Sequence, residues 1–138
     1  MAQLRTFIDS GVLLAAFKAG GELAENALAI FADSEREFVS SDFVRLELLP
    51  KAICYGNDTE RQFYETFFQN VEQLVRASTA LVETAEREAE AVGLSAMDAL
   101  HIAAAKHAAC DEFVTAEKPT KPLFRVTGIQ VTTIRPQT

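Results

Sequence analysis

The sequence has few of the residues that build disulfide-bonded, zinc-binding or membrane-spanning proteins. It contains two cysteines, Cys54 and Cys110, which are isolated and form no C-x-x-C pair. We therefore expect two reduced core thiols rather than a disulfide or a zinc site. No apolar run approaches the roughly 20 residues needed to span a bilayer, and the first residues show no signal-peptide pattern. These absences predict a cytoplasmic protein with no membrane segment.

Basic residues are also scarce. The 138 residues include 13 lysines and arginines against 20 aspartates and glutamates, which gives a formal net charge of −7. This balance argues against a protein that holds nucleic acid on a broad basic surface. It still allows an acidic metal site with a locally basic rim. Lys118, Lys121 and Arg125 are candidates for such a rim, but we interpret them in preference as solvated loop charges. The length suits one domain, residues 1–138, whose core needs no disulfide or structural metal.

A glycine-rich turn is missing after the first predicted strand. Residues 4–9 read as a buried strand that ends in Asp9, and Ser10 and Gly11 follow. This turn lacks the glycine fingerprint of a Rossmann nucleotide site. It also lacks the Asp-x-Asp of a haloacid-dehalogenase-type phosphatase and the adjacent acids of a phospho-acceptor receiver domain. The sequence therefore argues against these three classes.

Strand and helix patterns alternate along the rest of the chain. Short runs with branched or aromatic residues predict further strands at 36–41, 111–117 and 128–134, and the segment 72–78 is ambiguous. Helical spacing of apolar residues predicts helices at 10–20, 22–34, 41–54, 56–71, 79–94 and 95–110. Pro50 is expected to kink or end the third of these. The alternation predicts an α/β fold, a parallel β-sheet flanked by α-helices in an α/β/α sandwich.

Four carboxylates stand where such a sheet could gather them. Asp9 ends the first strand and Glu117 follows a later one, and ligands of parallel sheets bind beyond such strand ends. Glu47 and Asp98 lie on helices with mainly apolar neighbours. Ionised carboxylates at close range repel one another unless cations are present. Because hard divalent cations prefer oxygen ligands, the set is a candidate site for Mg²⁺ or Mn²⁺.

Each of these carboxylates also has a simpler explanation. Asp9 could cap the helix that follows it, and Asp98 could interact favourably with its helix dipole from the first turn. Glu47 and Glu117 could be solvated surface charges. His101, three residues after Asp98, is interpreted as a packed or hydrogen-bonded side chain rather than a metal ligand.

Four segments resemble the signature segments of the PIN-domain family and occur in the family's order. They are TFIDSGVLL, LELLP, MDALHIAAA and FVTAE. The resemblance implies a metal-dependent ribonuclease that hydrolyses RNA phosphodiester bonds. The acidic residues that it implies are Asp9, Glu47, Asp98 and Glu117, the first three as metal ligands, and the supporting hydrogen-bonding residues are Ser10 and Thr115. Glu117 departs from the pattern, because the family commonly has Asp at that position.

The size of the chain resembles that of the VapC-like toxins of bacterial toxin–antitoxin pairs. This resemblance implies an RNA substrate, a cognate antitoxin and a homodimer. The helix predicted at 56–71 carries four aromatic residues that could form such an interface or pack in the core, namely Phe63, Tyr64, Phe67 and Phe68. The alternative to a nuclease is a PIN fold kept as a non-catalytic interaction module.

Overall fold

The computed structural model describes residues 3–136, so residues 1–2 and 137–138 of the predicted domain lie outside the described residues. Within that range five strands form one sheet, and every pair of neighbours is parallel. The strands are β1 (Leu4–Ile8), β2 (Arg36–Ser41), β3 (Gln73–Val75), β4 (Glu112–Thr115) and β5 (Gln130–Thr133). Their order across the sheet is β3-β2-β1-β4-β5. The predicted parallel sheet is confirmed, and the ambiguous segment 72–78 contains its short edge strand.

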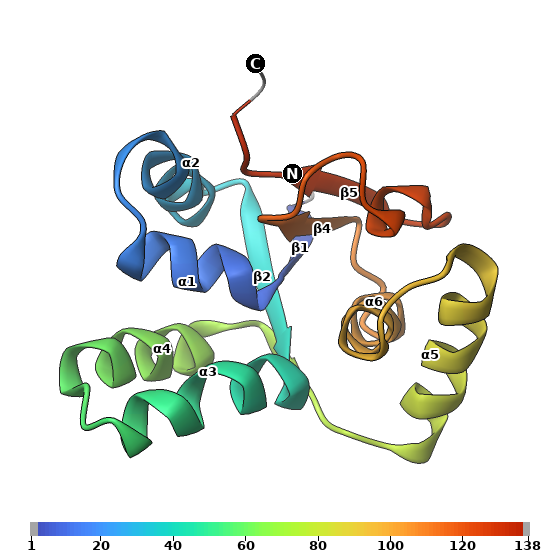
Figure 1. Cartoon of the computed structure of the whole chain (residues 1–138), viewed down its shortest axis with the longest axis horizontal. Helices are drawn as coiled ribbons and strands as arrows, with labels where there is room; N and C mark the ends of the chain where they lie inside the picture. Colours follow the sequence, from blue (N-terminus) through green and yellow to red (C-terminus); the bar gives the residue numbers. More distant parts are fainter. Residues whose placement is uncertain (1–2, 137–138) are drawn as a thin grey trace.

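Six α-helices flank this sheet in the described part of the chain. They are α1 (Ser10–Lys18), α2 (Gly21–Ala32), α3 (Asp42–Cys54), α4 (Asp58–Asn70), α5 (Thr79–Val92) and α6 (Ala96–His107). Figure 1 shows the sheet between α1–α4 and the pair α5 and α6, which confirms the predicted α/β/α arrangement. A short 3₁₀ helix, Pro122–Arg125, precedes β5 and was not predicted. No helix among residues 3–136 is long and apolar enough to cross a membrane.

The central strands are apolar because both faces of the sheet are covered. Phe7 and Ile8 of β1 and Phe113 and Val114 of β4 are fully buried. Phe7 and Phe113 are paired across the two strands, and their rings stack with centroids 5.3 Å apart. Burying side chains of this size stabilises the fold by roughly 1.5–3 kcal/mol each.

Helix α6 reaches the sheet because its side chains are small. Ala103, Ala104 and Ala105 are fully buried, so the helix backbone can lie close to its neighbours. The helix begins after Ser95, whose Oγ accepts a hydrogen bond from the backbone N–H of Asp98 at 3.3 Å. This cap fixes the first turn of α6, from which Asp98 projects.

One local expectation is wrong, namely that Cys54 is a core thiol. Helix α3 continues through Pro50 to Cys54, the end predicted for it, so Pro50 does not terminate the helix. Pro50 removes the N–H donor for the carbonyl of Leu46, and both residues are exposed, so water can satisfy that carbonyl. Cys110 is buried as expected, whereas Cys54 is exposed because the last turn of α3 extends beyond the core. Both thiols are free.

The aromatic residues of α4 divide between the two uses considered for them. Tyr64 and Phe68 are buried in the core. Phe63 and Phe67 are half-buried and line an apolar groove of about 480 Å³ together with residues of α1 and α2. Helix α4 therefore contributes to the core with one side and to a surface groove with the other.

Candidate metal centre

The carboxyl ends of β1 and β4 open into a cavity of about 250 Å³. Its lining residues are Asp9, Ser10, Gly11, Glu47, Asp98, His101, Thr115, Ala116, Glu117 and Arg135. Chain order reverses between these two strands, since β2 and β3 lie on one side of β1 and β4 and β5 on the other. Parallel sheets bind ligands at such a switch point. The structure thus brings the four carboxylates and the two hydroxyl residues singled out in the sequence to one cavity.

Asp9 is held from both sides of its carboxylate. Its Oδ1 accepts a hydrogen bond from the backbone N–H of Ser10 at 2.9 Å, so it does cap α1. Its Oδ2 accepts a hydrogen bond from Thr115 Oγ1 at 2.9 Å, and Thr115 Oγ1 in turn accepts one from the backbone N–H of Glu117 at 3.1 Å. Burial raises the pKa of Asp9, and the nearby charge of Asp98 raises it further, against the opposing effects of His101 and Thr115.

Glu47 reaches the cavity from the middle of α3. Its Oε1 accepts hydrogen bonds from Ser10 Oγ at 2.8 Å and from His101 Nε2 at 2.6 Å. The hydrogen bond from His101 is the main reason why the pKa of Glu47 is lowered, although partial burial acts in the opposite direction. Glu47 is therefore a fixed carboxylate and not the freely solvated charge that its helix position allowed.

His101 lies between the two carboxylates. It is buried, and its Nε2 is 3.8 Å from Asp9 Oδ1 and 2.6 Å from Glu47 Oε1. Burial lowers its pKa, but the hydrogen bond that it donates to Glu47 and the charges of Asp9, Glu47 and Asp98 raise it more, so the net shift is upward. Its Nδ1 has no hydrogen-bond partner among residues 3–136. The interpretation of His101 as hydrogen-bonded is confirmed, but the sequence reasoning missed that the bond is made to this cluster.

Asp98 and Glu117 complete the acidic lining with carboxylates that the protein leaves open. Both are half-buried and line the cavity, Asp98 from the first turn of α6 and Glu117 from the segment after β4. Within residues 3–136 their backbone N–H groups are hydrogen-bonded, whereas their carboxylate oxygens are not. These oxygens are free to bind a cation or water.

Arg135 is a cavity residue that the sequence reasoning did not select. It follows β5, which runs parallel to β4 and ends on the same edge of the sheet. Its Nε donates a hydrogen bond to the carbonyl of Ala116 at 2.7 Å, and its backbone N–H donates one to Thr133 Oγ1 at 3.0 Å. The one signal available was its position after a predicted parallel strand.

The donor set fits a hard divalent cation. Ligand atoms of Asp9, Glu47 and His101 all lie within 4.8 Å of one another. Asp98 acts electrostatically on Asp9 and His101 from the same cavity. A buried aspartate with a raised pKa beside other carboxylates is stabilised when a cation offsets their repulsion. Carboxylate oxygens in this number are the ligands preferred by Mg²⁺ and Mn²⁺.

Comparisons with known proteins add a family and a set of similar folds. A family model described as the PIN domain matches residues 6–119. No curated protein matches the sequence. VapBC2 from Rickettsia felis bound to a promoter DNA fragment has a similar fold, with a TM-score of 0.70, 15% identity, and coverage of 94% of this chain and 98% of that chain. A toxin–antitoxin complex from Klebsiella pneumoniae also has a similar fold, with a TM-score of 0.69 and 20% identity. The match covers 94% of this chain and 98% of that chain.

A further similar structure covers less of the chain. VapC20 from Mycobacterium tuberculosis, a toxin that cleaves the sarcin-ricin loop, gives a TM-score of 0.63 at 17% identity. The match covers 78% of this chain and 86% of that one. At these identities the likeness concerns the fold alone.

Proposed function

The chain belongs to the PIN domain family, and on that premise we propose that it is a metal-dependent endoribonuclease. The observation that carries this proposal is the gathering of Asp9, Glu47, Asp98 and Glu117 around one cavity at the switch point of the sheet. Oxygen donors in that number, in a cavity open to solvent, suit hydrolysis of a phosphodiester bond. The proposed domain is the whole chain, residues 1–138.

Asp9, Glu47 and Asp98 would hold Mg²⁺ or Mn²⁺ in this cavity. Such an ion lowers the pKa of bound water and offsets charge on a phosphate group. Thr115 fixes the rotation of the Asp9 carboxylate and Ser10 that of Glu47, through the hydrogen bonds of 2.9 and 2.8 Å. Partners of this kind orient ligand side chains.

Two further residues would act on the substrate side of the cavity. Arg135 carries a permanent positive charge, and its Nε bond to Ala116 holds the guanidinium at the cavity. Guanidinium groups bind phosphate oxygens well, so we assign Arg135 to the substrate phosphate. Glu117, with its free carboxylate, would orient water.

The proposed biological setting is a toxin–antitoxin pair in the cytoplasm, where an RNA substrate is present. Support comes from the fold that the chain shares with VapBC complexes. An apolar groove lined by Phe17, Leu28, Phe31, Phe63 and Phe67 would receive an apolar helix of an antitoxin or of a second copy in a homodimer. Co-purification with the product of an adjacent gene, and light scattering of the isolated chain, test these two partners.

The activity is tested by cleavage of a labelled single-stranded RNA with Mg²⁺, with Mn²⁺ and with a chelator. We expect cleavage with either ion, none with the chelator, and none for Asp9→Asn. Glu83→Gln is the matched control, because Glu83 is an exposed acid on α5 outside the cavity. Intact RNA in every arm, from a protein that still binds a partner, would identify the non-catalytic interaction module instead.

A further inference from the structure

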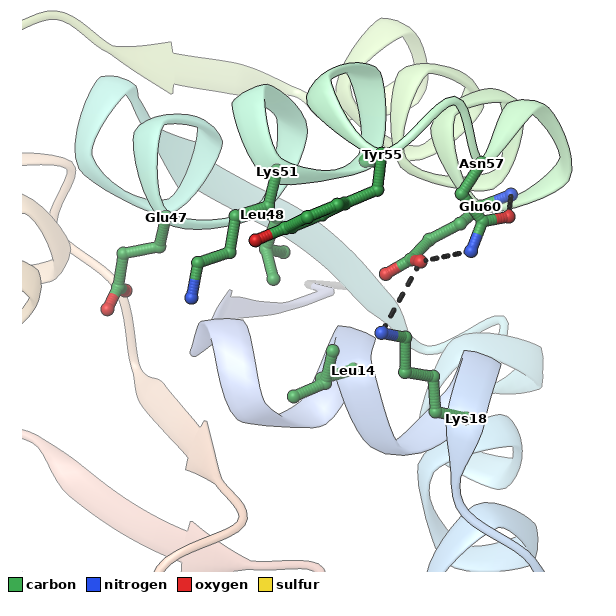
Figure 2. Close-up of a pocket in the computed structure, with 9 residues that line it drawn as sticks. Leu14, Lys18, Glu47, Leu48, Lys51, Tyr55, Asn57 and Glu60 are labelled. Atoms are coloured by element: carbon green, nitrogen blue, oxygen red, sulfur yellow. Dashed lines mark hydrogen bonds and ion pairs between the residues drawn. The ribbon is translucent and has the colours of Figure 1, made fainter.

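A second cavity of about 390 Å³ adjoins the acidic one and shares Glu47 with it. Figure 2 shows Glu47 and Lys51 on α3, with Tyr55 at the end of that helix, opposite Leu14 and Lys18 of α1. We call this cavity the α1–α3 groove. Its floor includes Leu48 and its walls carry two lysines, in a chain whose net charge is −7.

The groove leads away from the carboxylates along a single helix. Glu47, Lys51 and Tyr55 are spaced four residues apart, so they lie on one face of α3. At 1.5 Å per residue, Lys51 is about 6 Å and Tyr55 about 12 Å from Glu47 along the helix axis. A stacked nucleic-acid strand advances about 3.4 Å per nucleotide. The line of side chains from Glu47 through Lys51 to Tyr55 therefore has the length of a few nucleotides and begins at the acidic cavity.

Tyr55 is an exposed ring on a fixed backbone. Its relative exposure is 81%, the largest among the exposed large hydrophobic residues of the described chain. Its backbone N–H donates to the carbonyl of Lys51 at 3.0 Å, and the next residues, Gly56 and Asn57, donate to carbonyls of Ile53 at 3.1 Å and Ala52 at 2.9 Å. Packing in the core does not explain the choice of an aromatic residue at this position, because the side chain of Tyr55 is exposed. Its placement suits stacking on a planar ligand.

Of the two lysines in the groove, Lys51 supplies a positive charge, unpaired among the described residues, for a phosphate group. Lys51 is exposed and forms no ion pair within residues 3–136, whereas Lys18 lies 3.5 Å from the buried carboxylate of Glu60. The helix dipole favours a lysine in the last turn of α3, but it gives no reason for the aromatic ring beside it. Together, the unpaired cation of Lys51 and the free aromatic face of Tyr55 form the combination that binds single strands.

We propose that the α1–α3 groove binds the single-stranded RNA segment that flanks the cleaved bond, with Lys51 on a phosphate and Tyr55 stacked on a base. This inference deepens the proposed function and rests on it for the identity of the substrate. Leu14 and Leu48 offer apolar surface to the sugars, and Lys18 at the far wall is paired with Glu60. Stacking on Tyr55 accepts any base, because every base has a π-face.

The experiment measures binding of a short fluorescein-labelled single-stranded RNA of mixed sequence to the full chain in chelator, as a function of salt. Because chelator stops cleavage, binding is read independently of catalysis. Tyr55→Ala should weaken binding roughly tenfold at every salt concentration, because it removes a stacked base. Lys51→Ala should lower the slope of log K against log[salt] by about 0.7, the value for one phosphate contact on a single strand.

Two control variants distinguish loss of RNA binding at the groove from a general effect of changing the protein surface or its net charge. Tyr55→Phe keeps the aromatic face and should bind as the parent does, and Arg87→Ala removes an equal charge from α5, outside the groove, and should change neither affinity nor slope. Parent-like RNA binding by Tyr55→Ala and Lys51→Ala overturns the inference, even if the chain cleaves RNA. Loss of binding to a co-expressed protein in those variants, with RNA binding intact, assigns the groove to a protein partner and also overturns it. Groove-dependent binding by a chain that never cleaves RNA supports the groove and defeats the nuclease proposal.

Discussion

Asp9 shows how one side chain combines a structural and a chemical position. One carboxylate oxygen caps α1 and the other accepts the hydrogen bond of Thr115, yet the group still faces the cavity. The capping role offered by the sequence is confirmed, and the role as a metal ligand stays a prediction. His101 was harder to interpret, because the carboxylate that binds it, on Glu47, lies 54 residues earlier in the chain. Helical spacing shows which residues share a face, but it does not show what faces them.

The first prediction concerns Asp98. If Asp98 is a metal ligand, Asp98→Asn should abolish metal-dependent RNA cleavage. In chelator the variant should be as stable as the parent or more stable, because the charge of Asp98 raises the pKa of the buried Asp9. If Asp98 serves only the helix dipole, the variant should lose a few tenths to about 1 kcal/mol and keep its activity. Thermal melts beside a cleavage assay distinguish the two, and a destabilised, fully active variant contradicts the metal site.

The second prediction concerns pH. The pKa of His101 is raised in the folded protein, so its contribution to stability is complete below its ordinary pKa of about 6.5 and is lost as pH rises through the folded value. The raised pKa of Asp9 acts in the same direction, whereas the lowered pKa of Glu47 matters only in acid. In chelator the melting temperature should therefore fall between about pH 6 and pH 8.

His101→Gln should flatten this pH dependence. The matched control is His107→Gln, since His107 is an exposed residue at the end of the same helix. Melting curves in chelator across that pH range test the assignment. An unchanged slope in His101→Gln would assign the dependence to other groups.

At the scale of elements, the hydrophobic pattern predicted nearly every strand and helix. It left β3 ambiguous because three residues are too few for periodicity to show, and it missed the 3₁₀ helix for the same reason. The order of strands across the sheet depends on which edges pair, and no local pattern records that. Arg135 was not selected as a site residue for this reason, since it reaches the cavity only because β5 pairs with β4.

The third prediction concerns the turn that ends α3. Gly56 has φ of +65°, a conformation that side chains with a Cβ rarely adopt. Gly56→Ala should destabilise the fold by about 1 kcal/mol and loosen the position of Tyr55. Gly56→Asn should cost less, since asparagine tolerates this region. Urea denaturation measures both, and equal stability of Gly56→Ala and the parent would contradict the strain argument.

At the scale of the whole molecule, a chain of net charge −7 concentrates several of its carboxylates in one cavity. The family signatures located these residues in the sequence. That His101 and Arg135 line the same cavity needed the structure, because they come from α6 and from the segment after β5. Acidic patches of this kind make stability depend on the cations in solution.

The fourth prediction follows from that dependence. Mg²⁺ or Mn²⁺ should raise the melting temperature in a concentration-dependent way. At an ion concentration a hundred times the dissociation constant, the free energy of unfolding should increase by about 2.7 kcal/mol. Asp9→Asn should lose most of this effect, whereas Glu83→Gln should keep it. Differential scanning fluorimetry across a metal titration measures it. An equal shift in Asp9→Asn would place the bound ion elsewhere.

The hydrogen bond between Asp9 and Thr115 joins residues 106 positions apart, and this separation has a consequence for biosynthesis. A ribosome adds roughly 5–20 residues per second, so Asp9 and Glu47 emerge seconds before Asp98, Thr115 and Arg135. During that interval the nascent chain has neither the central pairing of β1 with β4 nor a closed cavity. The candidate metal centre is therefore incomplete until β4 and β5 have left the ribosome.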